Sequence, residues 1–138
     1  MKLHDIQGSH HPLSASWDTA IAVSSATDFI VIGRAPFRSN VVGAYFIPAV
    51  TVTGSATDNR ELEIRNRGSA GTGTTVAAEI TYTGSVVATA YIDNVVTVTG
   101  TAADFAVAEG DVLVVYRGTN GDGSLFPAGQ VVVELQAR

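Results

Sequence analysis

Strict alternation of apolar and polar side chains over short stretches is the feature that most constrains the fold of this chain. In residues 60–67, Leu62 and Ile64 alternate with charged residues, and residues 76–82 and 131–136 show the same period of two. A period of two places the apolar side chains on one face of a β-strand. These stretches therefore predict strands with one buried face and one face in water.

Three further stretches, residues 29–32, 41–47 and 112–116, are apolar on both faces. They predict either inner strands of a two-layer stack or strands that meet another chain. Residues 95–99 alternate valine with threonine and predict one more strand. Pro48 stands late in its stretch, which predicts a strand end or an edge because proline cannot donate a ladder hydrogen bond.

Glycine separates these stretches, and the chain holds 14 glycines. Glycine enters the turn conformations that join short strands. Hydrophobic residues make up 46 % of the chain and charged residues 15 %, a balance typical of a packed core. We expect an all-β, antiparallel sandwich or barrel of about eight or nine strands. For residues 101–108 the sequence is compatible with either a short helix or a loop.

Charge argues against a nucleic-acid partner. The formal net charge is −5, and Arg60, Arg65 and Arg67 form the only local cluster of basic residues, with Glu61 and Glu63 among them. A nucleic-acid-binding domain normally presents a basic face. No run of 18 apolar residues predicts a membrane span, and with no cysteine there is no disulfide.

Residues 1–18 differ from the rest because they hold all three histidines and little periodicity. We expect an N-terminal arm over residues 1–18, followed by one β-sandwich domain over residues 19–138. Apolar side chains spaced along that arm are candidates for docking onto another surface. Alternatively, the single tryptophan caps the domain's own core. The docking candidates are Leu3, Ile6, Leu13 and Trp17.

No residue pattern predicts catalysis or a cofactor. The histidines, His4, His10 and His11, match no zinc-ligand spacing, and we expect no metal site. No GxSxG motif and no grouping of serine, histidine and aspartate suggests a hydrolase. We therefore expect that the protein is not an enzyme. For Glu61 and Glu63, which share a strand face beside arginines, we expect solvated ion pairs.

Two glycine-rich loops resemble ligand-binding loops only superficially. Residues 68–75 (GSAGTGTT) lack the lysine of a phosphate-binding loop, and a strand is expected after them instead of a helix. Residues 119–124 (TNGDGS) lack the carboxylates and the closing glutamate of a calcium loop. We expect the first to connect two strands and the second to form a hairpin loop.

The stretch from about Arg60 to Leu135 resembles the head decoration proteins of tailed bacteriophages. The motifs that carry the resemblance are ELEIRNRGSAGTGTT, VAAEITYTG, VVTVTG, FAVAEGDVLVVYRG and GQVVVELQAR. The resemblance implies a jelly-roll-like β-sandwich that self-associates as a homotrimer. It implies a cementing protein on the capsid surface of a virion, which is assembled in the host cytoplasm and bridges subunits of the major capsid protein. It supplies no catalytic residues.

A different function remains open, because jelly rolls also serve as receptor- or glycan-binding modules of phage fibres and tails. Glycan binding favours exposed aromatic platforms. Five aromatic residues are expected within strands instead of loops, which favours the cementing role. They are Tyr45, Phe46, Tyr82, Tyr91 and Tyr116.

Overall fold

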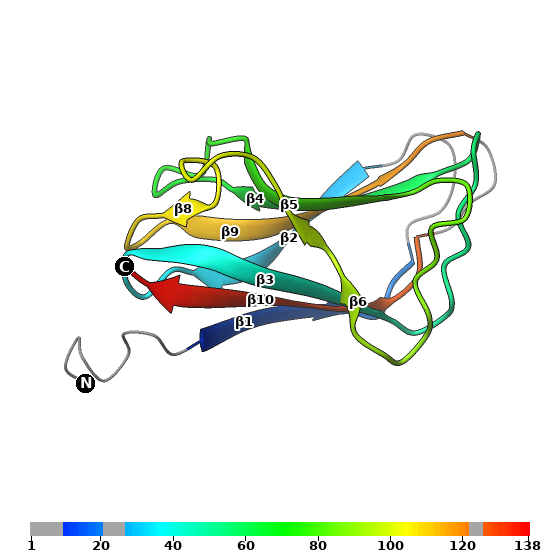
Figure 1. Ribbon diagram of the computed structural model, residues 1–138, viewed down its shortest axis with the longest axis horizontal. Helices are drawn as coiled ribbons and strands as arrows, with labels where there is room; N and C mark the ends of the chain where they lie inside the picture. Colours follow the sequence, from blue (N-terminus) through cyan, green and yellow to red (C-terminus); the bar gives the residue numbers. More distant parts are fainter. Residues whose placement is uncertain (1–9, 21–26, 122–125) are drawn as a thin grey trace.

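Strands make up all of the regular secondary structure in the computed structural model, which describes residues 10–20, 27–121 and 126–138. These residues form two antiparallel sheets packed face to face (Figure 1). No helix in the described ranges could span a membrane. The all-β prediction is confirmed, and each stretch predicted as a strand contains one, or in residues 95–99 two short ones.

The first sheet has the strand order β1-β10-β3-β6, and β8 also pairs with β3. The second sheet has the order β2-β9-β4-β5-β7. The strands of the first sheet are β1 (His10–Trp17), β10 (Gly129–Ala137), β3 (Ser39–Pro48), β6 (Asn94–Val95) and β8 (Ala106–Val107). Those of the second are β2 (Thr27–Arg34), β9 (Val112–Thr119), β4 (Arg60–Asn66), β5 (Thr75–Tyr82) and β7 (Thr97–Val98).

The order of the long strands is that of a jelly roll. Along the chain, β1, β2, β3 and β4 alternate between the two sheets, and β9 and β10 alternate again. Only the β4–β5 connection joins neighbours within one sheet among the seven long strands of the described ranges. The consequence is that each sheet is built from distant parts of the chain, as in the double Greek key.

The core lies between the sheets and is filled by the apolar side chains that the alternation predicted. Leu62 and Ile64 of β4 are fully buried, as are Val131 and Val133 of β10. Each such side chain contributes about 1.5–3 kcal/mol when it leaves water. The largest fully buried side chains are Tyr82, Phe46 and Phe126, and the ring centres of the two phenylalanines lie 5.5 Å apart.

Three expectations about local structure are corrected. Residues 10–17 are not an arm, because β1 pairs along its whole length with β10 from His10↔Gln136 to Trp17↔Gly129. Leu13, Ala15 and Trp17 alternate there with Pro12, Ser14 and Ser16, and this period of two was missed in the sequence. The rest of the predicted arm, residues 1–9, lies outside the described residues.

The second correction concerns the TNGDGS loop, which is not a hairpin loop. It connects β9 to β10, and these strands belong to opposite sheets.

The third correction concerns β4, whose outer face is not fully exposed to water: Glu63 is only 6 % exposed. Its carboxylate pairs with Arg65, whose guanidinium lies over the ring of Tyr116 at 4.1 Å. Those long side chains cover the carboxylate.

Residues 101–108 form a turn and then β8, which decides between the two alternatives in favour of a loop. The Asp104 carboxylate accepts hydrogen bonds from the Thr101 backbone N–H at 2.6 Å and the Thr101 hydroxyl at 2.9 Å. An aspartate that binds the backbone three residues back competes with helical hydrogen bonding. These bonds hold the pKa of Asp104 below its ordinary value.

One end of the sandwich is held together by the guanidinium of Arg117, which points into the core and is 2 % exposed. It pairs with the Asp28 carboxylate of β2 and donates to the Thr19 carbonyl oxygen at 3.1 Å. It also lies 4.8 Å from the ring centre of Trp17 at the end of β1. A single cation therefore joins the edge strands of both sheets.

The variant Asp28→Asn tests this role. It would leave the Arg117 cation buried without a counter-charge, and we expect the free energy of unfolding at pH 7 to fall by about 3 kcal/mol. Urea denaturation measures the change, with Asp93→Asn on an exposed turn as the control. Adding Arg117→Met to Asp28→Asn should recover part of the loss. A decrease for Asp28→Asn no larger than that of the control would contradict the role of Arg117.

Candidate functional site

The two described residues predicted to dock onto another surface, Leu13 and Trp17, pack against the domain's own core. The Trp17 ring stacks on Phe46 at 5.8 Å and lies 6.4 Å from Phe126. Its indole N–H donates to the Pro127 carbonyl oxygen at 2.8 Å. The core-capping alternative therefore describes Trp17. Leu3 and Ile6 lie outside the described residues.

The histidines of β1 cannot share one metal ion, because successive residues of a strand face opposite sides of the sheet. His10 lies on the outer face, where its Nδ1 is 3.0 Å from a Glu134 carboxylate oxygen. The His11 ring makes an edge contact with Phe37 at 4.8 Å. His4 lies outside the described residues.

A carboxylate cluster that the sequence analysis did not anticipate lies on the outer face of the second sheet. Glu61 and Glu63 come from β4, and Glu79 of β5 lies opposite Glu63 in the strand register. Oxygens of the three side chains lie within 4.8 Å of one another, a spacing that could hold a metal ion. Burial, and then the negative charge of Glu63, raise the pKa of Glu61 above its ordinary value. The charges therefore oppose folding at neutral pH.

Replacing Glu61 by glutamine tests this electrostatic cost. A carboxyl whose pKa is raised by folding contributes stability below its unfolded pKa and loses that contribution as pH rises through the folded pKa. We therefore expect Glu61→Gln to raise the melting temperature at pH 7 and to lose this advantage near pH 4. Thermal unfolding in the presence of a chelator measures it, with Glu109→Gln as the control. An equal or lower melting temperature at pH 7 would be inconsistent with the raised pKa.

Two groups of exposed apolar side chains are the strongest candidates for function. The first, called the β2 patch, consists of Phe29, Val31 and Tyr116 on the outer face of the second sheet. Phe29 is 49 % exposed and Val31 is 65 % exposed, and the Phe29 ring lies 5.4 Å from that of Tyr116. Arg65 and Arg67 lie over Phe29 at 5.6 and 5.4 Å. The patch is thus apolar with cations at its border.

The second group, called the Tyr91 surface, is formed by two hydrogen-bonded loop segments, residues 48–52 and 86–95. Val52 and Ala88 form an isolated β-bridge between them, and the Tyr91 backbone N–H donates to the Pro48 carbonyl oxygen at 3.0 Å. Figure 1 shows the second segment projecting beside β6. The exposed large apolar residues of this surface are Val50, Val86, Val87, Tyr91, Ile92 and Val95.

Tyr91 is 79 % exposed and lies in a turn, so the expectation that it belongs to a strand is wrong. Its φ of 62° is in the left-handed region, which costs a non-glycine residue about 1–3 kcal/mol. The side chain of Asn94 supports this conformation. Its amide N–H groups donate to the carbonyl oxygens of Phe46, Thr89 and Ile92, and its oxygen accepts from the Thr89 N–H. Four hydrogen bonds of the Asn94 side chain therefore hold the loop around Tyr91 in place.

The variant Asn94→Ala tests whether this side chain holds the loop. We expect faster amide hydrogen exchange in residues 89–94 and a loss of about 1 kcal/mol of stability, because four hydrogen bonds are lost, three of them exposed and one partly buried. Exchange in β9 and β10 should change less. Asp93→Ala, in the same loop and exposed, is the control. Unchanged exchange in residues 89–94 would mean that the backbone alone fixes the loop.

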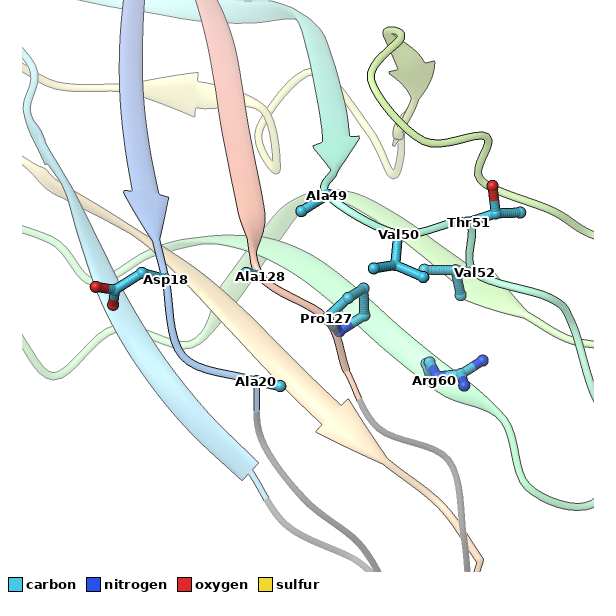
Figure 2. A pocket seen from close by; sticks show the side chains of 9 residues that line it. All are labelled: Asp18, Ala20, Ala49, Val50, Thr51, Val52, Arg60, Pro127 and Ala128. Atoms are coloured by element: carbon cyan, nitrogen blue, oxygen red, sulfur yellow. The ribbon is translucent and has the colours of Figure 1, made fainter.

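A cavity of about 470 Å³ lies beside the Tyr91 surface. Its walls are mainly apolar and come from the ends of β1 and β3 and the start of β10, and Figure 2 shows Val50, Val52 and Pro127 grouped between them. Arg60 of β4 also lines it and donates to the Thr53 carbonyl oxygen at 2.8 Å. Val50 belongs to both the cavity and the Tyr91 surface. The full lining is Asp18, Ala20, Ala49, Val50, Thr51, Val52, Arg60, Pro127 and Ala128.

The fold defines the chain as a β-sandwich with jelly-roll topology. No protein-family model matches it, and no curated protein matches it. Among solved structures, it is similar to a chain in the structure of infectious bursal disease virus, Gx strain, with a TM-score of 0.47 and 13 % sequence identity. That similarity covers 93 % of this chain and 32 % of the other, so this chain spans about a third of that chain's length.

Proposed function

We propose that this chain is a structural virion protein that binds the outer surface of a tailed-phage capsid and stabilises it by bridging major capsid subunits. The observation that carries the proposal is the presence of two separate exposed apolar surfaces on one jelly-roll domain, the β2 patch and the Tyr91 surface. Exposed apolar side chains gathered in this way mark protein contacts. Neither a catalytic role nor a cofactor or nucleic-acid partner is part of the proposal.

Two surfaces are what a self-associating cement requires, one for the shell and one for its own copies. We assign the shell contact to the β2 patch, since Arg65 and Arg67 give it a polar border around Phe29. A homotrimer would then present three such patches, and each would reach a different shell subunit. Linking three weak contacts raises the total affinity through effective concentration.

The N-terminal contribution to shell binding is now limited to residues before β1. Leu13 and Trp17 are packed against the core, and the remaining candidates, Leu3 and Ile6, lie outside the described residues. Deleting residues 1–17 would remove a paired edge strand along with the candidates. A deletion of residues 1–9 tests the arm without removing β1.

Decoration of purified capsids that lack the protein tests the proposal. We expect the wild-type chain to bind and to raise the temperature at which the shells disassemble. The double variant Phe29→Ser/Val31→Thr should bind about tenfold more weakly or worse, because apolar anchors at the centre of an interface dominate its affinity. Val42→Thr, at an exposed valine of the other sheet, is the matched control.

Binding of the double variant as tight as that of the control would remove the β2 patch from the proposal. A wild-type chain that neither binds shells nor protects them from heat would contradict the cementing role itself. If Leu3 and Ile6 contribute, the chain without residues 1–9 should bind shells more weakly than the wild type. Binding equal to that of the wild type would show that they do not contribute.

Glycan binding is the second candidate, and the exposure of Tyr91 is the observation that favours it. An aromatic ring on a rigid loop can stack against a sugar. A glycan array separates the two functions: specific binding of a glycan that is lost in Tyr91→Asn would support the module of a fibre or tail, and no binding would leave the structural role.

A further inference from the structure

We propose that Tyr91 of one copy inserts into the cavity beside Arg60 of a second copy, and that this contact is how the chain self-associates. The inference deepens the proposed function, on which it rests, by naming the surface that joins the copies. Its basis is the juxtaposition of a rigid, protruding aromatic side chain with a mainly apolar cavity whose wall is continuous with the same surface through Val50.

Rigidity makes Tyr91 suited to protein docking. The loop is already ordered by the four hydrogen bonds of Asn94, so little conformational entropy is lost when the ring is buried. Tyrosine is also among the residues that most often dominate interfaces. An exposed tyrosine held at a φ of 62° needs support from its surroundings, and the Asn94 network provides it.

The surroundings of Tyr91 favour a protein partner over a sugar. Ile92 is 53 % exposed, Val95 63 % and Val50 64 %, so the segments that carry Tyr91 also present exposed aliphatic side chains. A sugar site needs polar groups that converge on hydroxyls, in addition to a ring. An aliphatic surround instead gains free energy by leaving water against another apolar surface.

The cavity of the same chain has the complementary character. Its volume, about 470 Å³, lies within the range that admits small organic groups, and a phenol ring is smaller than most of these. Its alanine, valine and proline walls match an aromatic ring. The guanidinium of Arg60 suits the electron-rich ring face and the negative charge of Asp93, which follows Tyr91 by two residues in the chain. A second copy therefore supplies both partners of the contact.

The contact joins two different sites, the Tyr91 side chain and the cavity, which are continuous through Val50, so each copy donates one Tyr91 and accepts another. Contacts of this kind close into rings when the rotation between copies permits. A ring of three copies, each donating once and accepting once, would satisfy every Tyr91 and every cavity, and it would leave the β2 patches free for the shell.

Sedimentation velocity of the purified full chain at high micromolar concentration tests the inference. The wild type should sediment as a discrete oligomer. Tyr91→Asn removes the ring but keeps a residue that tolerates the left-handed region, so it should fold and associate roughly thirtyfold more weakly or not at all. Ala20→Trp, at an exposed residue of the cavity wall, should block the cavity with the same result.

Mixing Tyr91→Asn with Ala20→Trp tests directly whether Tyr91 of one copy binds the cavity of another. Tyr91→Asn retains an open cavity and Ala20→Trp retains Tyr91, so two chains that do not self-associate should form a one-to-one complex when mixed. The controls are Val31→Thr, an exposed apolar residue of the β2 patch, and Ala70→Trp, an exposed alanine of the β4–β5 turn, and both should associate like the wild type.

A monomeric wild type, an oligomer of Tyr91→Asn that matches the wild type, or no complex in the mixture would overturn the inference. A glycan that binds through Tyr91 while the wild type remains monomeric would overturn it in favour of the sugar. Shell binding is measured separately: a monomeric wild type that still decorates capsids would end this inference and leave the proposed function in place.

Discussion

The buried guanidinium of Arg117 is the interaction on which one whole end of the sandwich depends. It ties β2 through Asp28, the segment after β1 through Thr19, and the ring of Trp17 into one cluster. The same cluster positions Pro127, which accepts the Trp17 indole hydrogen bond and lines the cavity. The buried cation therefore also bears on one wall of the cavity, through Trp17 and Pro127.

The two apolar surfaces differ in how they are built. The β2 patch lies on a sheet face, where side chains are presented by regular strand geometry and bordered by Arg65 and Arg67. The Tyr91 surface lies on irregular backbone that one side chain, Asn94, holds in place. An edge strand such as β2 is normally protected from pairing with other chains. Here the bulge between Val31 and Gly33 and the inward Asp28 supply that protection while the outer face stays exposed.

Much of the fold could be predicted from residue order. The stretches around Leu62, Ile80 and Val133 carry a period of two strong enough to place β4, β5 and β10, and the doubly apolar stretches correspond to β2, β3 and β9. β1 was missed although Leu13, Ala15 and Trp17 alternate with Pro12, Ser14 and Ser16, because the small alanine and the adjacent histidines give a weak apolar signal. Tyr91 was misplaced because its neighbours are valine-rich, and a local pattern carries no record of the distant Pro48 and Phe46 carbonyl groups that hold the loop.

By itself, the sequence determined the all-β class, the positions of most strands and the balance of charge, because each depends on neighbours a few residues apart. Only the tertiary structure decided that Trp17 caps the core, that Glu63 is covered, and that Val50 joins an exposed aromatic loop to a cavity. These features depend on residues that are far apart in the chain and meet only when the strands have chosen their sheets. The sheet to which each strand belongs depends on how well all the side chains of the two facing sheets pack together. A short stretch of the sequence carries no information about that packing.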